Sequence, residues 1–167
     1  SDKFPDKTDL FELLLWMYDV SGKKAEAIKE LDEKIKIAPN AKYYFLRGYK
    51  GYSMNANSKE ALEYYKKALE LEPGNYDANW EYGRIVYNES YSEYSNLSAT
   101  QQKAKKEQYI ETWKDAKQHL MIATENSEYT KDDKILLLGN LKNVCIMLGE
   151  ESNAQMYDDQ IKALKAL

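Results

Sequence analysis

A spacing of 34 residues recurs in the first half of the chain and restricts the possible folds more than any other feature of the sequence. Three pairs of residues share it: Ala27 and Ala61, Leu31 and Tyr65, and Pro39 and Pro73. A period of this length is typical of chains in which one supersecondary unit is repeated and each copy buries its apolar face against the next. The chain is therefore expected to be an array of repeated units.

The repeated unit has the pattern of two helices followed by a stop. Between residues 60 and 73 the apolar side chains recur at the spacing of one α-helical face: Ala61, Tyr65, Ala68 and Leu69. Pro73 and Gly74 follow, where a helix ends. The preceding helix carries Gly48, which leaves room for a neighbouring helix to approach closely. Only 7 Gly and 3 Pro occur in 167 residues, which favours helices over a sheet with many tight turns.

Residues that begin or end helices support this division. Ser98-Ala-Thr-Gln101 and Ser152-Asn-Ala-Gln155 match capping boxes, and Thr130 is a further N-cap candidate. Gly22 and Gly149 fall between paired helices, where a tight turn needs glycine. We expect helices near residues 6–20, 23–37, 41–54, 58–71, 75–90, 99–125, 131–148 and 151–165.

The residues at the repeated positions resemble the tetratricopeptide repeat. The first copy reads Phe11-x2-Leu14-Leu15-x2-Tyr18, then Ala27-x3-Leu31 and Pro39, and the second reads Tyr44-x2-Arg47-Gly48, then Ala61-x3-Tyr65, Ala68 and Pro73. A third begins at Tyr82-Gly83 and resumes at Ala116-x3-Leu120-x2-Ala123, and a fourth reads Leu138-x2-Leu141-x3-Cys145, then Gly149 and Ala154. Three positions depart from the family pattern: Leu15, Gly51 and Asp158. The resemblance implies one all-α domain over residues 1–167, a right-handed superhelix of about four antiparallel helix pairs, with repeats near 8–40, 41–74, 75–127 and 130–165.

The third repeat contains an insertion at residues 88–107. In that copy 33 residues separate the Gly and Ala anchors, against 13 in the second copy. Residues 88–97 are expected to form a polar loop. One interpretation is a longer second helix whose first turns extend beyond the array. The other is a hairpin that contacts a partner through Tyr91 and Tyr94.

Stacked helix pairs form a concave face, and the resemblance implies that the first helix of each pair lines it. The predicted groove positions are rich in aromatic residues: Trp16, Phe45, Tyr49, Tyr52, Trp80, Arg84 and Tyr87, with the acidic Glu12 and Asp19 beside them. Aromatic rings bury a large area at low entropic cost, which suits a bound peptide. Arg84 is suited to hold a carboxylate or to stack on a ring. The alternative is that a terminal helix covers this face.

Two classes of function fit these residues. The first is a noncatalytic protein–protein interaction module that holds a peptide segment of a partner protein, whose identity the sequence does not give. The alternative is sugar or small-molecule binding by the same aromatic residues, as part of a surface nutrient-capture system. Peptide binding predicts polar groups such as Asn79 and Arg84 spread along the groove. Sugar binding predicts coplanar Trp and Tyr rings in one pocket.

No motif for catalysis, metal or cofactor binding is recognisable in the sequence. His119 is the single histidine and has no second ligand at metal-binding spacing. Cys145 lies on an apolar stripe and is expected to be a buried structural thiol. We therefore expect no enzymatic activity, no metal and no cofactor.

Charge and hydropathy restrict the partners and the location. The formal net charge is −4 at pH 7, which gives no reason to expect nucleic-acid binding. No apolar run approaches the roughly 18 residues that a membrane-spanning helix needs. The sequence starts at Ser1 rather than Met, which leaves cytoplasmic, periplasmic and secreted locations open. The oligomeric state is also open.

Overall fold

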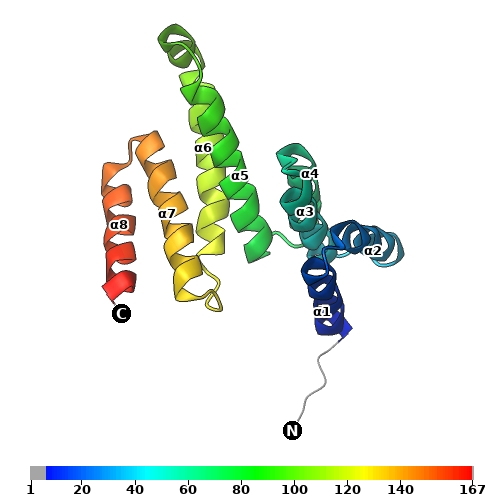
Figure 1. The fold of residues 1–167 in the computed structure, drawn as a ribbon. Coiled ribbons are helices and arrows are strands. Elements are labelled where there is room, and N and C mark those ends of the chain that lie inside the picture. The colour runs from blue at the N-terminus through cyan, green and yellow to red at the C-terminus, as the bar shows by residue number, and fades with distance from the viewer. Residues whose placement is uncertain (1–6, 167) are drawn as a thin grey trace. The chain divides into compact units, whose positions relative to one another are not determined.

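The computed structural model describes residues 7–166, except for the side chains of residues 7–10 and Glu12. These residues form helices joined by short connections (Figure 1). The helices are α1 (Lys7–Val20), α2 (Lys24–Ile37), α3 (Ala41–Asn55), α4 (Ser58–Leu71), α5 (Tyr76–Ser95), α6 (Ala99–Ala123), α7 (Lys131–Leu148) and α8 (Glu151–Ala166). The predicted all-α fold of about four antiparallel helix pairs is confirmed. The predicted helix ends agree within two residues, apart from the end of α5.

The chain divides into two compact units, residues 1–68 and 69–167. In the first unit, α1 and α2 form a helical hairpin around a small core of Phe11, Leu15, Ala27 and Leu31. Tyr43 and Leu46 of α3 pack against this core. The ring of Tyr43 meets that of Phe11 edge to face, with a centroid distance of 5.4 Å. Within this unit the first helix pair thus buries its apolar face against α3 of the next pair, as the 34-residue spacing predicts.

Gly48 is the point of closest approach between α3 and α4. A Cβ atom at this position would lie 2.8 Å from Cε1 of Tyr65 and 3.1 Å from Cβ of Tyr64. Tyr65 is fully buried, so its ring occupies the volume that a side chain at Gly48 would need. In the pair of α1 and α2, Leu15 stands at the position of Gly48 and is larger, whereas Leu31 stands at the position of Tyr65 and is smaller. Both leucines are buried in the same core.

Arg47 connects three helices of the first unit. Its Nε donates a hydrogen bond to Asp32 of α2 at 2.8 Å, and its Nη2 donates one to Glu60 of α4 at 3.0 Å. The guanidinium lies over the ring of Tyr64, 4.6 Å from its centroid. The residue is buried, so both carboxylates and the ring compensate a cation that is largely removed from water.

The second unit contains the larger core. It is built from buried residues of all four of its helices: Tyr87 of α5, Trp113 and Leu120 of α6, Leu137, Leu141 and Val144 of α7, and Tyr157 of α8. Gly83 of α5 lies against α6, because an added Cβ would be 2.8 Å from the carbonyl oxygen of Ala116. The close approach predicted at Gly48 is therefore confirmed, and it recurs at Gly83, the glycine of the third repeat.

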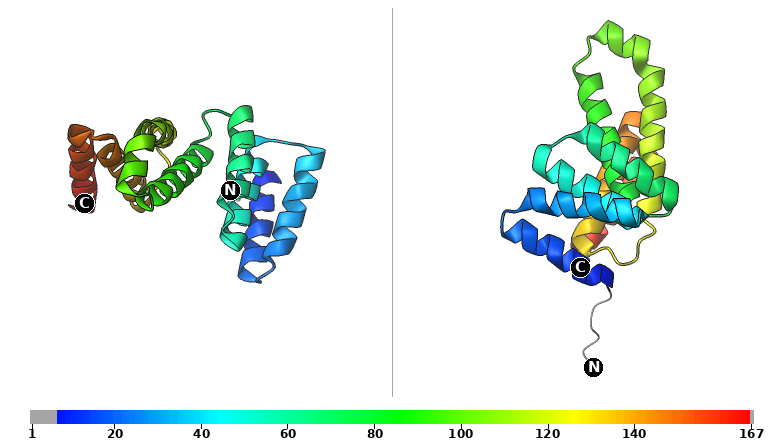
Figure 2. Two further views of the ribbon diagram at one scale, coloured as in Figure 1. Left: turned by 90° about the horizontal axis from the view of Figure 1, so that it is seen from above. Right: turned by 90° about the vertical axis from the view of Figure 1, so that its right-hand side faces the viewer.

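The insertion lengthens both helices of the third pair instead of forming a loop. The hairpin of α5 and α6 extends beyond the next pair, in which α7 packs beside α6 and α8 lies beside α7 (Figure 1, Figure 2). The expected polar loop at residues 88–97 is wrong, since α5 continues to Ser95. The reason is tertiary packing. Ser90 is buried and accepts a hydrogen bond from the indole Nε1 of Trp113 at 3.1 Å, and the ring of Tyr94 packs edge to face on Trp113 at 5.2 Å.

Helix ends follow the predicted signals at most positions. Ser98 with Gln101 and Thr130 with Asp133 form reciprocal capping boxes at the starts of α6 and α7. Gly22 and Gly149 both have a φ of +73°, as the two tight turns require. The predicted capping box at Ser152 is wrong, because α8 begins at Glu151 and Ser152 lies within its first turn.

Cys145 is fully buried in α7, as predicted for a structural thiol. Burial raises the pKa of its thiol to about 11. Its Sγ lies 3.6 Å from Oε2 of Glu150, a carboxylate that forms an ion pair with Lys117 of α6. This contact holds the turn between α7 and α8 against α6.

Gly48 and Gly139 provide a matched pair of substitutions within helices. Gly48→Ala is expected to lower the free energy of unfolding by about 1–2 kcal/mol, because overpacking against Tyr65 outweighs the gain in helix propensity. Gly139→Ala is expected to raise it by about 0.5–1 kcal/mol, since nothing lies within 4 Å of the added methyl group. Urea unfolding followed by circular dichroism measures both. Equal effects of the two substitutions would contradict the close approach at Gly48.

Candidate functional site

The exposed aromatic residues of the first unit lie on α1 and α3, the first helices of its two helix pairs. Trp16 of α1 is 58% exposed and Tyr49 of α3 is 45% exposed. Phe45, one turn before Tyr49, is half-buried, with its ring 5.8 Å from the buried ring of Tyr65 and 5.9 Å from that of Tyr49. Tyr52 is also half-buried. The rings of Trp16 and Tyr49 therefore face water, whereas the ring of Phe45 packs against a buried residue.

Of the two acidic residues predicted beside these aromatic rings, the structure describes the side chain of Asp19 but not that of Glu12. Asp19 of α1 forms an ion pair with Lys50 of α3, so its carboxylate joins the first helix pair to the second. The side chain of Glu12 lies outside the described residues. Asp19 therefore has a structural role that its position in the sequence pattern did not reveal.

In the second unit Trp80 is half-buried and packs on Tyr129, a residue of the connection between α6 and α7. The ring centroids lie 5.1 Å apart, and the ring planes are inclined by 58°. The hydroxyl of Tyr129 donates a hydrogen bond to Oδ1 of Asp77 at 2.8 Å. Burial and the neighbouring carboxylate raise the pKa of Tyr129 above its ordinary value, so it stays a neutral donor. Tyr129 was not singled out from the sequence, because it follows no helical pattern.

Arg84 and Tyr87 are less available than the sequence suggests. The half-buried guanidinium of Arg84 donates hydrogen bonds to both carboxylate oxygens of Glu81, at 3.3 and 2.5 Å. Tyr87 is buried in the core of the second unit. A ligand carboxylate at Arg84 would therefore have to compete with Glu81.

The two tyrosines of the insertion lie in different surroundings. Tyr91 is 44% exposed, and its ring stacks at 5.8 Å on that of Tyr87. Tyr94 is half-buried between Tyr109 and Trp113, with centroid distances of 5.1 and 5.2 Å. Only Tyr91 of this pair presents much of its ring to water.

Asn79 and His119 form a partly buried polar contact between α5 and α6. The side chain of Asn79 is fully buried, and its Nδ2 donates to the carbonyl oxygens of Pro73 and Asn75, each at 2.9 Å. Its Oδ1 must therefore accept the hydrogen bond from Nδ1 of His119 at 2.6 Å. Asn79 is therefore not one of the polar groups that peptide binding predicts along the groove, because it is fully buried and the protein itself uses both polar atoms of its amide.

His119 has its proton on Nδ1 in this arrangement and is held neutral by its surroundings. Burial lowers the pKa of its imidazole, and Asp115, whose Oδ1 lies 3.8 Å from Nε2, opposes this effect. The ring also packs on Tyr82 at a centroid distance of 4.5 Å. His119 is therefore a packing residue with one directed hydrogen bond.

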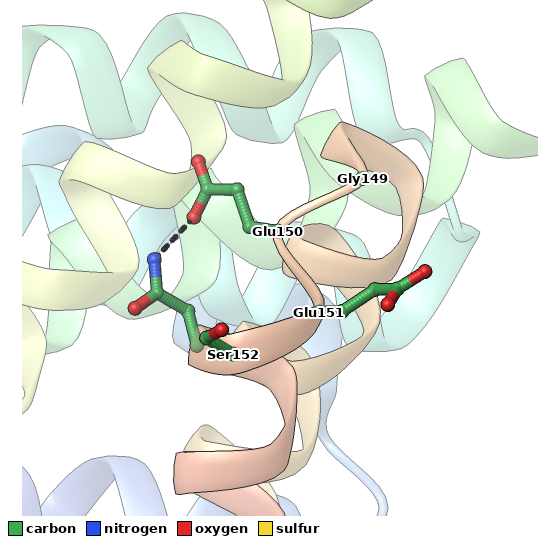
Figure 3. A pocket seen from close by; sticks show the side chains of 5 residues that line it. Gly149, Glu150, Glu151 and Ser152 are labelled. Atoms are coloured by element: carbon green, nitrogen blue, oxygen red, sulfur yellow. Dashed lines mark hydrogen bonds between the residues drawn. The ribbon is translucent and has the colours of Figure 1, made fainter.

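Among the residues that the structure describes, the second unit has clefts at three places where no predicted groove residue lines them. One is at the turn between α7 and α8, a second runs along Ile146 and Ala154 on these helices, and a third is bounded by Tyr129, Leu138 and Leu164. At the turn, the carboxylates of Glu150 and Glu151 point in different directions, and Glu150 accepts a hydrogen bond from Asn153 at 2.7 Å (Figure 3). The two carboxylates do not converge on one point.

No protein-family model matches the sequence. No curated protein matches it either. Among solved structures, the crystal structure of MamA is similar over 97% of this chain and 80% of its own, with a TM-score of 0.58 and 15% sequence identity. A MamA RS-1 ArsTM double mutant is similar over 98% of this chain and 97% of its own, with a TM-score of 0.45 and 14% identity. The first similarity shows that the chain shares the fold of MamA.

Within residues 7–166 no helix is long and apolar enough to cross a membrane. In the same part of the chain, no three side chains of His, Cys, Asp or Glu are grouped where they could hold a metal ion.

The half-buried position of His119 predicts that stability depends on pH between 7 and 5. Because the folded-state pKa lies below the ordinary 6.5, the unfolded chain binds more protons as the pH falls through this range, and the free energy of unfolding decreases. In His119→Gln this decrease should disappear, since no other histidine is present and an amide can still donate to Asn79. Thermal unfolding at pH 7, 6 and 5 measures it. A wild-type stability that rises towards pH 5 would show that Asp115 dominates instead.

Proposed function

We propose that the chain is a noncatalytic protein-binding module of the tetratricopeptide-repeat type, which binds a peptide segment of a partner protein. The assignment to this repeat type is supported by the 34-residue spacing and by the close helix approaches at Gly48 and Gly83. The packing of α3 on the hairpin of α1 and α2 agrees with it.

One observation carries the proposed binding surface. Trp16 follows Leu15 and Tyr49 follows Gly48, so the two rings occupy equivalent positions of successive repeats, and both are about half exposed to water. Rings of this size on rigid helices lose little conformational freedom when a partner covers them. We assign the contacts in the first unit to Trp16, Phe45, Tyr49 and Tyr52.

In the second unit, taken by itself, we assign contacts to Trp80 and Arg84. Trp80 offers part of an indole ring anchored on Tyr129, and Arg84 offers a guanidinium already oriented by Glu81. Tyr87 is left out of the proposal because it is buried in the core. The partner segment is expected to be a peptide with apolar side chains opposite the rings.

Sugar or small-molecule binding is the alternative, and the ring geometry favours the peptide. The inclination of 58° between Trp80 and Tyr129 does not give the flat platform on which a sugar ring would stack. The planes of Phe45 and Tyr49 are inclined by 30°. Inclined rings that are spread over separate helices suit the side chains of an extended peptide better than one planar ligand.

Tyr49 and Tyr91 give a matched test, because their exposed fractions are 45% and 44%. Peptides selected from a display library against the wild-type chain are titrated by calorimetry. Tyr49→Ala is expected to weaken binding by about tenfold or more, because a tyrosine that acts as a binding hot spot contributes about 2 kcal/mol and about 1.4 kcal/mol already corresponds to tenfold. Tyr91→Ala is expected to leave it unchanged.

The opposite result would move the binding surface to the insertion. Selection of no peptide, together with binding on a carbohydrate array, would favour the alternative function. Circular dichroism of both variants is the control, since neither side chain is buried and the helical signal should not change.

A further inference from the structure

One side of α6, the second helix of the longest hairpin, carries a row of lysines. The row, which we call the lysine row, consists of Lys103, Lys106, Lys114 and Lys117, with Ile110 in the middle. Successive members are three or four residues apart, and this spacing places all five side chains on the same side of a helix.

Contacts within the second unit show which way the lysine row faces. Lys117 forms an ion pair with Glu150, at the turn between α7 and α8. Ile110 is half-buried and packs against the second core. Tyr109, its neighbour, is turned by about 100° around the helix and donates a hydrogen bond to Glu93 of α5 at 3.4 Å. Thus α6 turns Tyr109 towards α5 and the lysine row towards the side on which α7 packs.

The lysine row continues beyond the helices that cover its lower end. The helix pair that follows α6 stops short of the outer part of the row, because α7 ends at Leu148 and the hairpin of α5 and α6 projects past this point (Figure 1). Lys103 and Lys106 are exposed, and neither forms an ion pair with any residue that the structure describes. Lys114 is exposed as well and is paired only along its own helix, with Glu111 at 2.7 Å.

The covered end of the lysine row shows which chemical group the row binds. The side chains of Lys117 and Glu150 are only 17% and 32% exposed, so their ion pair is partly removed from water. At this end a carboxylate from another element has reached the row and is held there. The same type of side chain is repeated at Lys114, Lys106 and Lys103, where no such carboxylate arrives. A carboxylate-bearing segment is therefore the partner that complements the open part of the row.

The spacing of the open part fits an extended segment. With a rise of about 1.5 Å per residue, Lys106, Ile110 and Lys114 follow one another at about 6 Å along the helix. Alternate side chains of an extended chain point the same way and are about 6.6 Å apart. A segment with an acidic residue, any residue, an apolar residue, any residue and an acidic residue would therefore place a carboxylate at each lysine and its apolar group at Ile110.

We propose that the lysine row binds an extended acidic segment of a partner protein, in which an apolar residue lies between two carboxylates at alternate positions. Charge complementarity selects this partner: the chain as a whole has a net charge of −4, whereas residues 99–108 contain three lysines and one glutamate. The site goes beyond the proposed function, because it lies on the second helix of a pair and shares no residue with the proposed aromatic surface.

Two features favour a peptide over nucleic acid as the occupant. Ile110 offers an apolar contact in the middle of the row. Glu107 lies four residues after Lys103, and Glu111 lies three residues before Lys114, so both glutamates stand beside the row. A nucleic-acid backbone, which carries a charge on every phosphate, would bring some of these charges against the two glutamates. A peptide with carboxylates at alternate positions avoids them.

A titration followed by nuclear magnetic resonance tests the site on the full chain. The probe is the blocked peptide Ser-Glu-Ser-Leu-Ser-Glu-Ser, added at about 50 mM salt, where exposed charges are screened little. Backbone amide signals of residues 103–114 are expected to shift with peptide concentration. In Lys103→Gln/Lys106→Gln the dissociation constant is expected to rise about fivefold, as the loss of two exposed charge pairs predicts. Lys103→Arg/Lys106→Arg should bind as the wild type does, because it keeps both charges.

Lys105→Gln/Lys131→Gln is the matched control. Both lysines are exposed and lie outside the row, and this variant has the same net charge as Lys103→Gln/Lys106→Gln. It should bind the peptide as the wild type does, and a probe with Gln in place of both Glu residues should cause no shifts. Absence of shifts with the acidic probe, or an equal loss of binding in the control, would overturn the proposal.

The remaining occupants are tested on the same signals. Oligothymidylate and vesicles of phosphatidylcholine and phosphatidylserine in equal amounts are added in place of the peptide. Shifts of residues 103–114 with either of them, but not with the peptide, would assign the lysine row to nucleic acid or lipid and overturn the proposal. Shifts that appear when the protein alone is concentrated, and that vanish in Lys103→Gln/Lys106→Gln, would assign it to a second copy with the same consequence.

Discussion

The fold depends on how closely the paired helices approach each other. At Gly48 and Gly83 a hydrogen atom stands where any other residue would place a carbon within about 3 Å of the facing helix. The room is used by Tyr65 in one pair and by Leu120 and the backbone of Ala116 in the other. In the first pair a larger residue, Leu15, stands at the glycine position and a smaller one, Leu31, stands at the tyrosine position, so both helices contribute side chains to the contact.

Charged and polar groups then orient the helices that the apolar contacts bring together. Arg47 binds carboxylates from two different helices, and Lys50 binds a third on α1. In the second unit the comparable connections are Lys117 with Glu150, and Asn79 with His119. Each of these contacts is partly removed from water, so it is stronger and more directional than an ion pair on an open surface. Such contacts fix the register of one helix against the next.

Local periodicity explains why most of the fold could be predicted from the sequence. Helix ends are set by residues within one turn, such as Ser98 with Gln101, and the repeat anchors are set by spacing. Contacts between distant residues could not be derived in this way. Asn79 and His119 are 40 positions apart, and nothing in their neighbourhoods indicates that they meet. The burial of Tyr87 likewise depends on α6 and α7, which surround it.

The sequence around the insertion does contain a pattern that predicts the continuation of α5. Tyr87, Tyr91 and Tyr94 recur at four- and three-residue spacing, which is the pattern of a helix face, although the residues between them are polar. The candidate surface could be predicted less well than the fold. The pattern gave the exposed Trp16 and Tyr49 correctly, but it did not reveal that Arg84 is held by Glu81.

The three tryptophans differ in their surroundings, and this has a spectroscopic consequence. Trp16 of the first unit is already in water, whereas Trp113 of the second is enclosed by tyrosine rings and Trp80 is partly covered. Unfolding of the first unit changes the environment of its indole little, while unfolding of the second exposes two shielded indoles. Intrinsic fluorescence excited at the indole band therefore reports mainly on residues 69–167, and the far-ultraviolet signal reports on the whole chain.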